Sequence, residues 1–474
     1  MAHEEPAAAK PGLACAPVLP AAPSGQRRQI REWPVGSHVT LRPVESIVLG
    51  IVVLALLALT LAAPHPGLTA LTTGFLGIFL ASALIRLAAI LTPRRGNSAP
   101  PLPEDALPPY TVIVPLYREA EVAAELAVNL NRLDYPRDRL QVLIALEASD
   151  QATQAAFAAL PLPDHIEVLI VPEGHPRTKP RACNFALDQA TGAHVVIYDA
   201  EDAPHPGQLR EAAARFAAGS LELACLQAPL RIETPAYLAF IAEQFRLEYA
   251  ALFEVILPAF ARWGLPFPLG GTSNHFRIAP LRAIGGWDPY NVTEDADIGF
   301  RLAAAGYSLD TLNLPTLETA PTRLRQWGPQ RARWIKGHLQ TLVCHGRTGP
   351  RLGLRTFSAL LITLAVPVAA SNLHAPAMLI ALLAMLEDWR VDGIVSIPIA
   401  HMVFYVGCWA ICALGGALGV LRSGGAPRFL HLFGLVPYWL MWILASPRAL
   451  LQFFFAPHHW DKTQHAPRAG RHAP

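Results

Sequence analysis

The feature that most constrains this chain is a long polar stretch, residues 100–350, enclosed between apolar segments. Two apolar runs precede it and three follow it, at 44–63, 68–91, 357–386, 394–421 and 429–456. About 20 apolar residues are enough for a helix to cross a bilayer. With 52% hydrophobic and 16% charged residues and a mean hydropathy of +0.31, the chain is more apolar than an ordinary soluble protein. We therefore expect an integral membrane protein with a large soluble domain.

Basic residues beside the first two runs predict their orientation. Arginines precede the first run and follow the second, at Arg94 and Arg95, whereas none lies between the runs. Because cytoplasmic loops carry an excess of Lys and Arg, both ends of the 44–95 pair are expected in the cytoplasm. Residues 1–43 are rich in Ala and Pro and lack a signal-peptide pattern, so they are expected to be a disordered cytoplasmic tail. A formal net charge of +2 gives no reason to expect a nucleic-acid partner.

The last apolar run has two interpretations. Three full crossings after the polar stretch would place the C-terminus outside, yet the basic residues beyond the run argue for the cytoplasm. Pro437 and Pro447 also interrupt it. We therefore expect region 355–456 to combine transmembrane helices with a re-entrant or interfacial one, and 457–474 to be a C-terminal tail.

Within the polar stretch, which we take as one domain over 100–350, short β-rich segments alternate with helical ones. The β-rich segments are 110–116, 140–146, 166–171 and 194–198, and the helical ones are 119–132, 151–159, 179–190 and 206–218. This alternation predicts an α/β domain with a parallel sheet and helices on both faces. Ligands of such sheets bind beyond the carboxyl ends of the strands. Two longer helices, 236–260 and 326–346, are expected on the membrane surface or in ordinary packing.

An acidic cluster, Asp199-Ala200-Glu201-Asp202, follows the fourth β-rich segment, where the ligand is expected. Residues i and i+2 of an extended segment point the same way, so Asp199 and Glu201 can converge on one ion. Mg²⁺ or Mn²⁺ needs few carboxylates when water and phosphate supply the remaining oxygens. A bound cation would neutralise the charge of a departing diphosphate. A solvated acidic turn is the alternative interpretation of this motif taken alone.

A second acidic motif, Thr293-Glu294-Asp295, opens a predicted helix that continues to about Ala305. Thr293 suits an N-cap and acidic residues suit a first helical turn, which is a purely structural reason for the motif. In the functional interpretation, Asp295 is a general base that takes the proton of an attacking acceptor hydroxyl.

A third motif, Gln330-Arg331-Ala332-Arg333-Trp334, lies in the predicted 326–346 helix. Gln330, Arg333 and Trp334 share one helix face, because they are spaced at i, i+3 and i+4. Arg333 can fork onto a diphosphate, and Trp334 has a flat ring of the kind on which sugars stack. An amphipathic surface helix with a buried Trp is the alternative.

Two further segments suit a nucleotide. Lys179 begins the predicted 179–190 helix, and a Lys at a helix N-terminus makes an anion site. Tyr117 follows the first β-rich segment and offers a ring against which a nucleotide base can lie.

In this order, the motifs resemble those of the family-2 glycosyltransferases, in particular the membrane-embedded processive branch with the bacterial cellulose, curdlan, chitin and hyaluronan synthases. The matching segments are VPLYREAE, TKPRACN, DAED, GGTSNHFR, TEDADIGFRL and QRARW. The resemblance implies a GT-A domain inserted between transmembrane helices and an inverting reaction with a UDP-sugar, UDP-glucose being favoured. It also implies a multi-pass protein of the bacterial inner membrane whose catalytic domain faces the cytoplasm.

The resemblance also implies residue roles. Asp295 with Glu294 is catalytic, and Asp199, Glu201 and Asp202 are the metal ligands. The nucleotide-sugar would be bound by Tyr117, Glu119, Glu147, Asp150, Lys179, Asn184, Asp199, Gln330 and Arg333. The acceptor would be bound by Gly271, Thr272, Asn274 and Trp334. In the tail, Trp460-Asp461-Lys462-Thr463-Gln464-His465 is similar to a gating segment of some members.

Two departures from the family pattern leave alternatives open. The family usually has Asp-Asp-Gly-Ser after the second strand, whereas this chain has Glu147-Ala148-Ser149-Asp150. Either Glu147 or Asp150 would then meet the uridine, and Glu147 is favoured by position. In the acidic cluster, either Glu201 or Asp202 would complete the metal site.

The predicted function is polymerisation of a sugar from a UDP-sugar into an exopolysaccharide, which is translocated through the protein's own spans. The expected partners are the UDP-sugar, the growing glycan, membrane lipid, and export or periplasmic subunits. Aromatic residues of the C-terminal runs would line the path, namely Trp409, Tyr438, Trp439 and Trp442. The alternatives are single transfer to a lipid carrier and a catalytically inactive assembly subunit.

Overall fold

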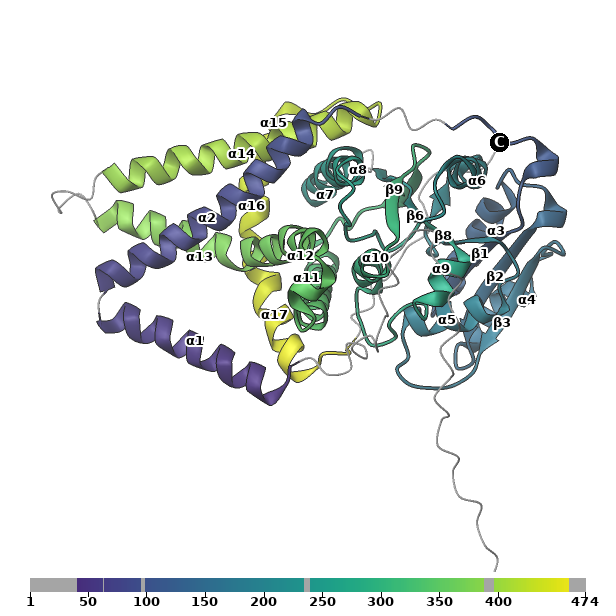
Figure 1. Cartoon of the computed structure of the whole chain (residues 1–474), viewed down its shortest axis with the longest axis horizontal. Coiled ribbons are helices and arrows are strands. Elements are labelled where there is room, and N and C mark those ends of the chain that lie inside the picture. The colour runs from purple at the N-terminus through teal and green to yellow at the C-terminus, as the bar shows by residue number, and fades with distance from the viewer. Residues whose placement is uncertain (1–40, 63, 95–98, 234–238, 388–395, 460–474) are drawn as a thin grey trace, which may run out of the picture.

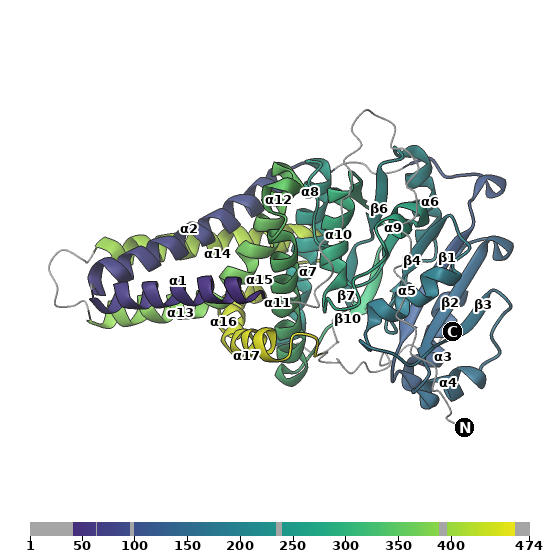
Figure 2. The same ribbon diagram turned by 60° about the horizontal axis from the view of Figure 1, so that its bottom comes forward.

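A computed structural model describes residues 41–62, 64–94, 99–233, 239–387 and 396–459. Nearly all of the expected N-terminal tail, the loop after Glu387 and the gating-like segment from Trp460 lie outside these ranges. Apolar helices project from one side of the molecule, the α/β domain forms the other side, and a layer of helices lies between them (Figures 1 and 2).

The α/β domain is built on a seven-stranded sheet with strand order β3-β2-β1-β4-β8-β6-β9. Its strands are β1 (Tyr110–Leu116), β2 (Leu140–Glu147), β3 (Ile166–Val171), β4 (His194–Ile197), β6 (Leu223–Gln227), β8 (Asn274–Arg277) and β9 (Ser308–Thr311). The first four strands pair in parallel, as expected. Strand β8 runs antiparallel to both β4 and β6, so the sheet is mixed and not wholly parallel.

Helices cover both faces of this sheet. They are α3 (Ala123–Asn131), α4 (Gln151–Ala158), α5 (Lys179–Gln189), α6 (Gln208–Ala218), α9 (Ile278–Ala283) and α10 (Glu294–Ala304). Successive residues of a strand point to opposite faces, so Ile113 of β1 packs toward α5 and α10, whereas its neighbours Val112 and Val114 pack toward α3 and α6. Burial on both faces explains why the central strands are continuous apolar runs.

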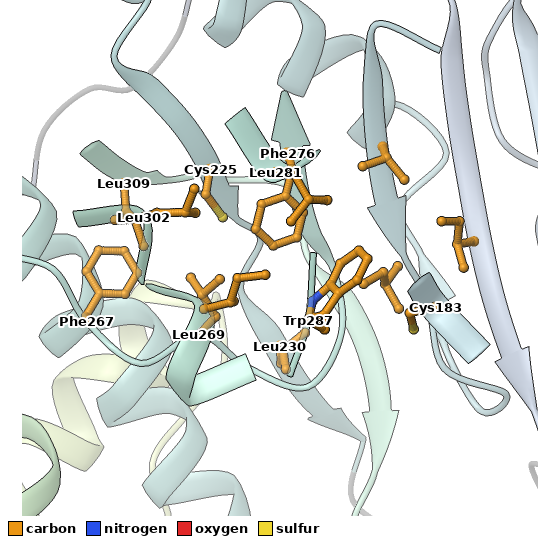
Figure 3. Close-up of a cluster of buried hydrophobic side chains, with 14 of the residues drawn as sticks. Cys183, Cys225, Leu230, Phe267, Leu269, Phe276, Leu281, Trp287, Leu302 and Leu309 are labelled. Carbon is orange, nitrogen blue, oxygen red and sulfur yellow. The ribbon is translucent and has the colours of Figure 1, made fainter. Parts of the chain in front are cut away.

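Figure 3 shows the core on the α5 and α10 side of the sheet. Trp287, which is 2% exposed, packs edge-on against Phe276 of β8 with ring centroids 5.8 Å apart. Cys183 of α5 and Leu302 of α10 belong to the same cluster. This packing fixes the relative positions of the helices that carry the Lys179 and Asp295 motifs.

A second, three-stranded sheet lies at the edge of the domain, with strand order β5-β10-β7. Its strands are β5 (Ala203–Pro204), β7 (Leu230–Glu233) and β10 (Thr316–Thr319). Strand β5 directly follows the acidic cluster, and Ala203 pairs with Leu317 of β10. The small sheet therefore fixes the end of the acidic loop.

Between the domain and the apolar helices lie α7 (Phe240–Ala251), a π-helical turn (Leu252–Ile256), α8 (Leu257–Arg262) and α11 (Leu324–Gly346). The expected helices 236–260 and 326–346 are thus present, the first with a π-helical turn inside it. Glu254 of that turn is 1% exposed and pairs with Arg94, at 3.3 Å, and with Arg231, at 2.8 Å. The end of the second apolar run is thereby tied to the catalytic domain.

The apolar helices are α1 (Pro43–Ala62), α2 (Pro64–Leu91), α12 (Leu354–Leu360), α13 (Val366–Glu387), α14 (Ser396–Arg422), α15 (Phe429–Phe433), α16 (Leu435–Leu440) and α17 (Trp442–Phe455), with a π-helical turn (Leu361–Ala365) between α12 and α13. Within the described ranges, four segments are long and apolar enough to cross a membrane, namely Gly74–Leu91, Leu354–Pro376, Val403–Arg422 and Phe429–Phe455. Many of their large side chains are exposed, as expected where lipid replaces water.

The last of these segments differs from the others in direction. Helices α16 and α17 lie at the boundary with the catalytic domain and cross α13 at a steep angle (Figure 1). That is the orientation expected of a re-entrant or interfacial segment. The number of membrane crossings itself stays a prediction.

Candidate active site

Three elements bring the predicted catalytic and metal-binding residues together. Asp199 lies just past β4, Asp295 lies in the first turn of α10, and Gly271 lies in the loop before β8. A Cβ atom placed on Gly271 would lie 3.5 Å from Oδ2 of Asp295 and 3.9 Å from Oδ2 of Asp199. Gly271 therefore lies close to both carboxylates, and its lack of a side chain adds no atom beside them.

Lys179 joins this group from the N-terminus of α5. Its Nζ pairs with Oδ1 of Asp199 and donates to the carbonyl of Gly271 at 2.6 Å. Burial alone would lower the pKa of Lys179, but Asp199 and Glu294 raise it above its ordinary value. Lys179 thus stays charged beside the acidic cluster, which is the position an anion-binding Lys would need.

The acidic cluster separates into two kinds of carboxylate. Asp202 is 1% exposed, and its Oδ2 accepts hydrogen bonds from the backbone N–H of Asp199, at 2.7 Å, and from the hydroxyl of Thr272. Asp199 and Glu201 are half-buried at the surface of the loop. Of the alternatives left open by the sequence, Asp202 shapes the loop, and Glu201 has the more accessible side chain.

Negative charge accumulates at this loop. Burial, and then Asp199 and Glu201, hold the pKa of Asp202 well above its usual range. Burial and these three acids do the same to Glu318 of β10, a residue that the sequence patterns did not single out. Oδ1 of Asp202 is buried with no hydrogen-bond partner in the described part of the chain. An excess of crowded carboxylates fits a divalent cation.

These acids do not form a complete metal cage. Within the described ranges, no three His, Cys, Asp or Glu side chains are arranged to hold a metal by themselves. This is consistent with Mg²⁺ or Mn²⁺, which take ligands from water and from substrate phosphates. Asp199 and Glu201 are the side chains that would hold such an ion together with a diphosphate.

The first turn of α10 carries the expected base, although its cap differs from the prediction. Thr293 occupies the N-cap position but makes no side-chain cap bond to the helix. Oδ1 of Asp295 accepts from the N–H of Ala296 at 2.8 Å. Burial raises the pKa of Asp295, whereas that N–H, Lys179 and Arg333 lower it. Burial and then Asp295 raise the pKa of Glu294 to about 7.

Helix α11 packs directly on the turn that carries the base. A Cβ atom on Gly337 would lie 2.2 Å from Oγ1 of Thr293, so only a glycine permits this approach. Gln340 accepts from the N–H of Val292 at 3.1 Å, and Thr341 accepts from the Asn291 amide at 2.9 Å. The third motif is thereby placed against the second.

On α11, Arg333 acts on the acids of α10, whereas Trp334 packs with Arg331, Phe245 and Tyr249. Arg333 lowers the pKa of both Glu294 and Asp295. The Trp334 ring is half-buried and lies 4.4 Å from the guanidinium carbon of Arg331, which covers it. Its Phe245 and Tyr249 neighbours are 5.9 and 6.2 Å away between centroids. One ring face is therefore occupied within the protein. Gln330 is half-buried, and its Oε1 has no hydrogen-bond partner in the described part of the chain.

On the expected uridine side, the polar residues hold one another. Glu147 is 4% exposed and pairs with Arg181 at 3.2 Å. Asp150 caps α4 through the N–H of Thr153 and also accepts from the N–H of Arg118. Glu119 is 8% exposed, and its N–H donates to Thr153 at 3.0 Å. The half-buried ring of Tyr117 has the Arg118 guanidinium 5.0 Å from its centroid. Contact of these residues with a nucleotide stays a prediction.

Three other predicted binding residues lie beneath the site. Asn184 holds the backbone of Trp287 through two hydrogen bonds. Its amide N–H donates to the carbonyl of Trp287 at 2.7 Å, and its amide oxygen accepts from the backbone N–H of Trp287 at 2.9 Å. Asn274 is 2% exposed and donates to Gly270 and Gln227. Thr272 is equally buried against Asp202. These residues support the site. Gly271 and Trp334 are half-buried, and their contact with an acceptor stays a prediction.

The C-terminal segment is docked against α11. Lys336 is fully buried and donates to the carbonyl of His459 at 2.6 Å, while Gln340 donates to that of Pro457 at 3.0 Å. His458 also packs edge-on against Tyr290, with centroids 5.4 Å apart. Lys336 and Gln340 thus hold the segment up to His459 against α11.

A mixed α/β sheet of this topology, with an acidic loop beyond β4 and apolar helices on both sides in sequence, is that of a membrane-associated glycosyltransferase of the GT-A fold. Residues 108–337 match the family described as "Glycosyltransferase like family 2". The chain carries a family-2 glycosyltransferase domain and is a glycosyltransferase, so the interpretation as an inactive assembly subunit is set aside.

Known proteins resemble this chain to different extents. "Beta-monoglucosyldiacylglycerol synthase" of Synechocystis sp. is 26% identical over 81% of this chain and 82% of its own length. "Cellulose synthase 1 catalytic subunit [UDP-forming]" of Komagataeibacter xylinus is 28% identical over 57% of this chain, but this covers only 37% of its own length. Among solved structures, "Mannosyltransferase PcManGT from Pyrobaculum calidifontis in complex with GDP-Man and Mn2+" has a TM-score of 0.54 at 22% identity, covering 82% of this chain and 97% of that chain.

Proposed function

We propose that the protein transfers a hexose from a UDP-sugar, UDP-glucose being favoured, to a hydroxyl of a membrane lipid, with inversion at the anomeric carbon. The observation that carries the reaction is the arrangement around Gly271, where a carboxylate suited to the leaving group and one suited to the attacking group both lie within 4 Å of the position of an added Cβ atom. The same turn is packed on α11, which contacts the apolar helices. An acceptor delivered by the membrane would therefore arrive beside Asp295.

In this reaction Asp295 takes the proton of the acceptor hydroxyl as its oxygen attacks the anomeric carbon. The bond between that carbon and the diphosphate oxygen breaks, and its electron pair leaves with UDP. Lys179 and Arg333 supply positive charge near the departing diphosphate. Mg²⁺ or Mn²⁺ held by Asp199 and Glu201 would add charge neutralisation there, and the Mn²⁺ with GDP-Man in the mannosyltransferase of like fold supports such an ion.

A lipid acceptor is favoured by how the relatives match. The Synechocystis lipid glucosyltransferase matches over about four fifths of both chains, at 81% and 82%, so the match extends beyond the catalytic domain into the apolar helices. Two further relatives with the same name, from Nostoc sp. and Trichormus variabilis, match over 58% and 56% of this chain. The membrane segments are the part that must differ between a lipid acceptor and an exported polymer.

Polymerisation is the second candidate. It is supported by the match to cellulose synthase and by the stem at His459, which leads toward the gating-like segment and is docked on the same helix as Trp334. The predicted export or periplasmic subunits belong to this case. Of the aromatic residues expected along a glycan path, Tyr438 is 2% exposed and bonded inside the protein. For both candidates we propose a bacterial inner membrane with the catalytic domain in the cytoplasm.

The test is product analysis with the full chain in lipid nanodiscs. Purified protein is incubated with radiolabelled UDP-glucose, other UDP-sugars in turn, Mg²⁺ or Mn²⁺, and diacylglycerol. A lipid-extractable monoglycosyl product supports the proposal, whereas an ethanol-insoluble polymer without labelled lipid would replace it with polymerisation. The Asp295→Asn variant should lose transfer but retain UDP binding by calorimetry, and retained transfer would exclude Asp295 as the base.

A further inference from the structure

Arg331 stands in the middle of the third motif but points away from the diphosphate side. Residues two apart on a helix face about 200° away from one another, so Arg331 lies opposite Arg333, while Trp334 at i+3 is its neighbour on the same side. Arg331 is 1% exposed and is among the largest fully buried side chains of the described ranges. A buried guanidinium is costly unless it is paired and fully hydrogen-bonded.

Two helices outside α11 supply the pairing. Glu248 of α7 accepts from both arms of the Arg331 fork, at 2.8 and 2.6 Å. Tyr438 of α16 accepts from Arg331 at 2.8 Å and from Trp327 at 3.0 Å, and donates to Glu248 at 3.0 Å. One Tyr hydroxyl thus links the apolar C-terminal run to the motif helix and to α7.

Aromatic rings enclose the remaining surface of the guanidinium. Its carbon lies 4.4 Å from the ring centroid of Trp334, 4.5 Å from that of Phe245 and 5.1 Å from that of Trp442. Such cation–π contacts are stronger when water is excluded. The Trp334 ring is therefore held by Arg331 on one side and by Phe245 and Tyr249 nearby.

We infer that Arg331 is a positioning residue that sets the acceptor-facing orientation of Trp334, and that the membrane helix α16 sets Arg331 through Tyr438. The inference rests on the proposed role of Trp334 at the acceptor side. It adds to that role, because the orientation of Trp334 then depends on the position of α16 relative to α11. The donor side is served by Lys179 and Arg333, which face the acids, and does not depend on this link.

The chain offers a matched control. Arg347 ends the same helix and forms an equally bidentate pair with Glu45 of α1, at 2.9 Å for both bonds, without contacting Trp334. Arg331→Lys and Arg347→Lys each keep a positive charge and lose a fork. Tyr438→Phe is the mild variant, since it keeps the ring and removes only the hydroxyl.

The experiment compares Michaelis constants in nanodiscs, with diacylglycerol or a short glucan primer as acceptor, whichever the wild-type protein uses. Arg331→Lys should raise the acceptor KM about 10-fold and Tyr438→Phe about 3-fold, with the UDP-sugar KM changed less than about 2-fold. Arg347→Lys should leave both constants near wild type. UDP-sugar hydrolysis without acceptor should persist in all variants.

The outcomes separate the two proposals. A wild-type protein that uses the primer and never the lipid refutes the proposed lipid acceptor, and the inference is then judged on the primer. An unchanged acceptor KM in Tyr438→Phe overturns the inference, as does an equal effect of Arg347→Lys. If Arg331→Lys does not fold, Tyr438→Phe decides alone.

Discussion

At Gly337, the addition of one methyl group should separate helix α11, which carries the third motif, from the turn of Thr293, which carries the second. A Cβ atom there would lie 2.2 Å from Oγ1, 2.5 Å from Cγ2 and 2.7 Å from Cβ of Thr293. Because Cβ itself is among these atoms, no rotamer of Thr293 relieves the overlap. Contact would be about 1 Å too short, so α11 must move away from the turn that carries Asp295.

The magnitude of this effect follows from the displacement. Overpacking of this kind costs about 1–3 kcal/mol of stability, and a 1 Å misplacement of catalytic groups costs about 100-fold in rate. Gly337→Ala should therefore lower kcat by about two orders of magnitude and lower the midpoint of thermal unfolding. Gly346→Ala is the control in the same helix, since nothing lies within 4 Å of its added Cβ.

A double-mutant cycle tests the contact between Gly337 and Thr293. Thr293→Gly removes all three overlapping atoms, and Gly is tolerated at an N-cap. In the Thr293→Gly background, Gly337→Ala should cost little further activity, which would give a coupling energy above about 1 kcal/mol. The assay is UDP release in nanodiscs, with thermal unfolding in parallel. Wild-type kcat in Gly337→Ala, or an equal loss in both backgrounds, would refute the close packing of α11 on the base.

Two further predictions concern the acids. Glu201→Gln should raise the Mg²⁺ or Mn²⁺ concentration needed for half-maximal UDP release at least about 10-fold. Asp202→Asn should mainly lower the midpoint of thermal unfolding. The reverse pattern would show that Asp202 is the metal ligand and that Glu201 shapes the loop. Burial raises the pKa of Glu294 from 4.5 to about 7, so its contribution to stability is fully present below pH 4.5 and is lost as the pH rises through about 7. The thermal midpoint of the protein without metal and nucleotide should fall over that range, and Glu294→Gln should flatten this part of the profile; an unchanged slope would show that Glu294 does not titrate there.

The sequence predicted the first half of the domain almost to the residue. Strands 110–116 and 166–171 have the predicted bounds, because short runs rich in β-branched residues and bounded by turn residues are typical of strands. The later strands were missed. Strand β5 has only two residues and β10 four, and their pairing joins segments more than 100 residues apart. Such short strands carry no periodicity, since distant partners and not local pattern make them extended.

The candidate site was predicted in the same uneven way. Motif order identified Asp199, Asp295 and Arg333, but could not tell a ligand-facing side chain from one that supports it. The Asn184 amide bonds the backbone of Trp287, and the Asn274 amide bonds the backbone of Gly270 and the side chain of Gln227, contacts that only the tertiary structure reveals. Glu318 lies in none of the sequence motifs. It comes close to the acidic loop only because β10 pairs with β5.

The position of helix α11 explains why the two arginines of the third motif, Arg331 and Arg333, have different environments. Its acid-facing side presents Arg333 to Glu294 and Asp295, and Gly337 allows that side to approach the base. Its opposite side buries Arg331 between α7 and the apolar α16. Trp334 lies beside Arg331 and belongs to the boundary between the two sides. If α11 moves relative to α16, both Trp334 and the turn that carries Asp295 must move with it. Membrane attachment is therefore part of how the active site is assembled, and detergents that loosen α16 should impair acceptor use before donor binding.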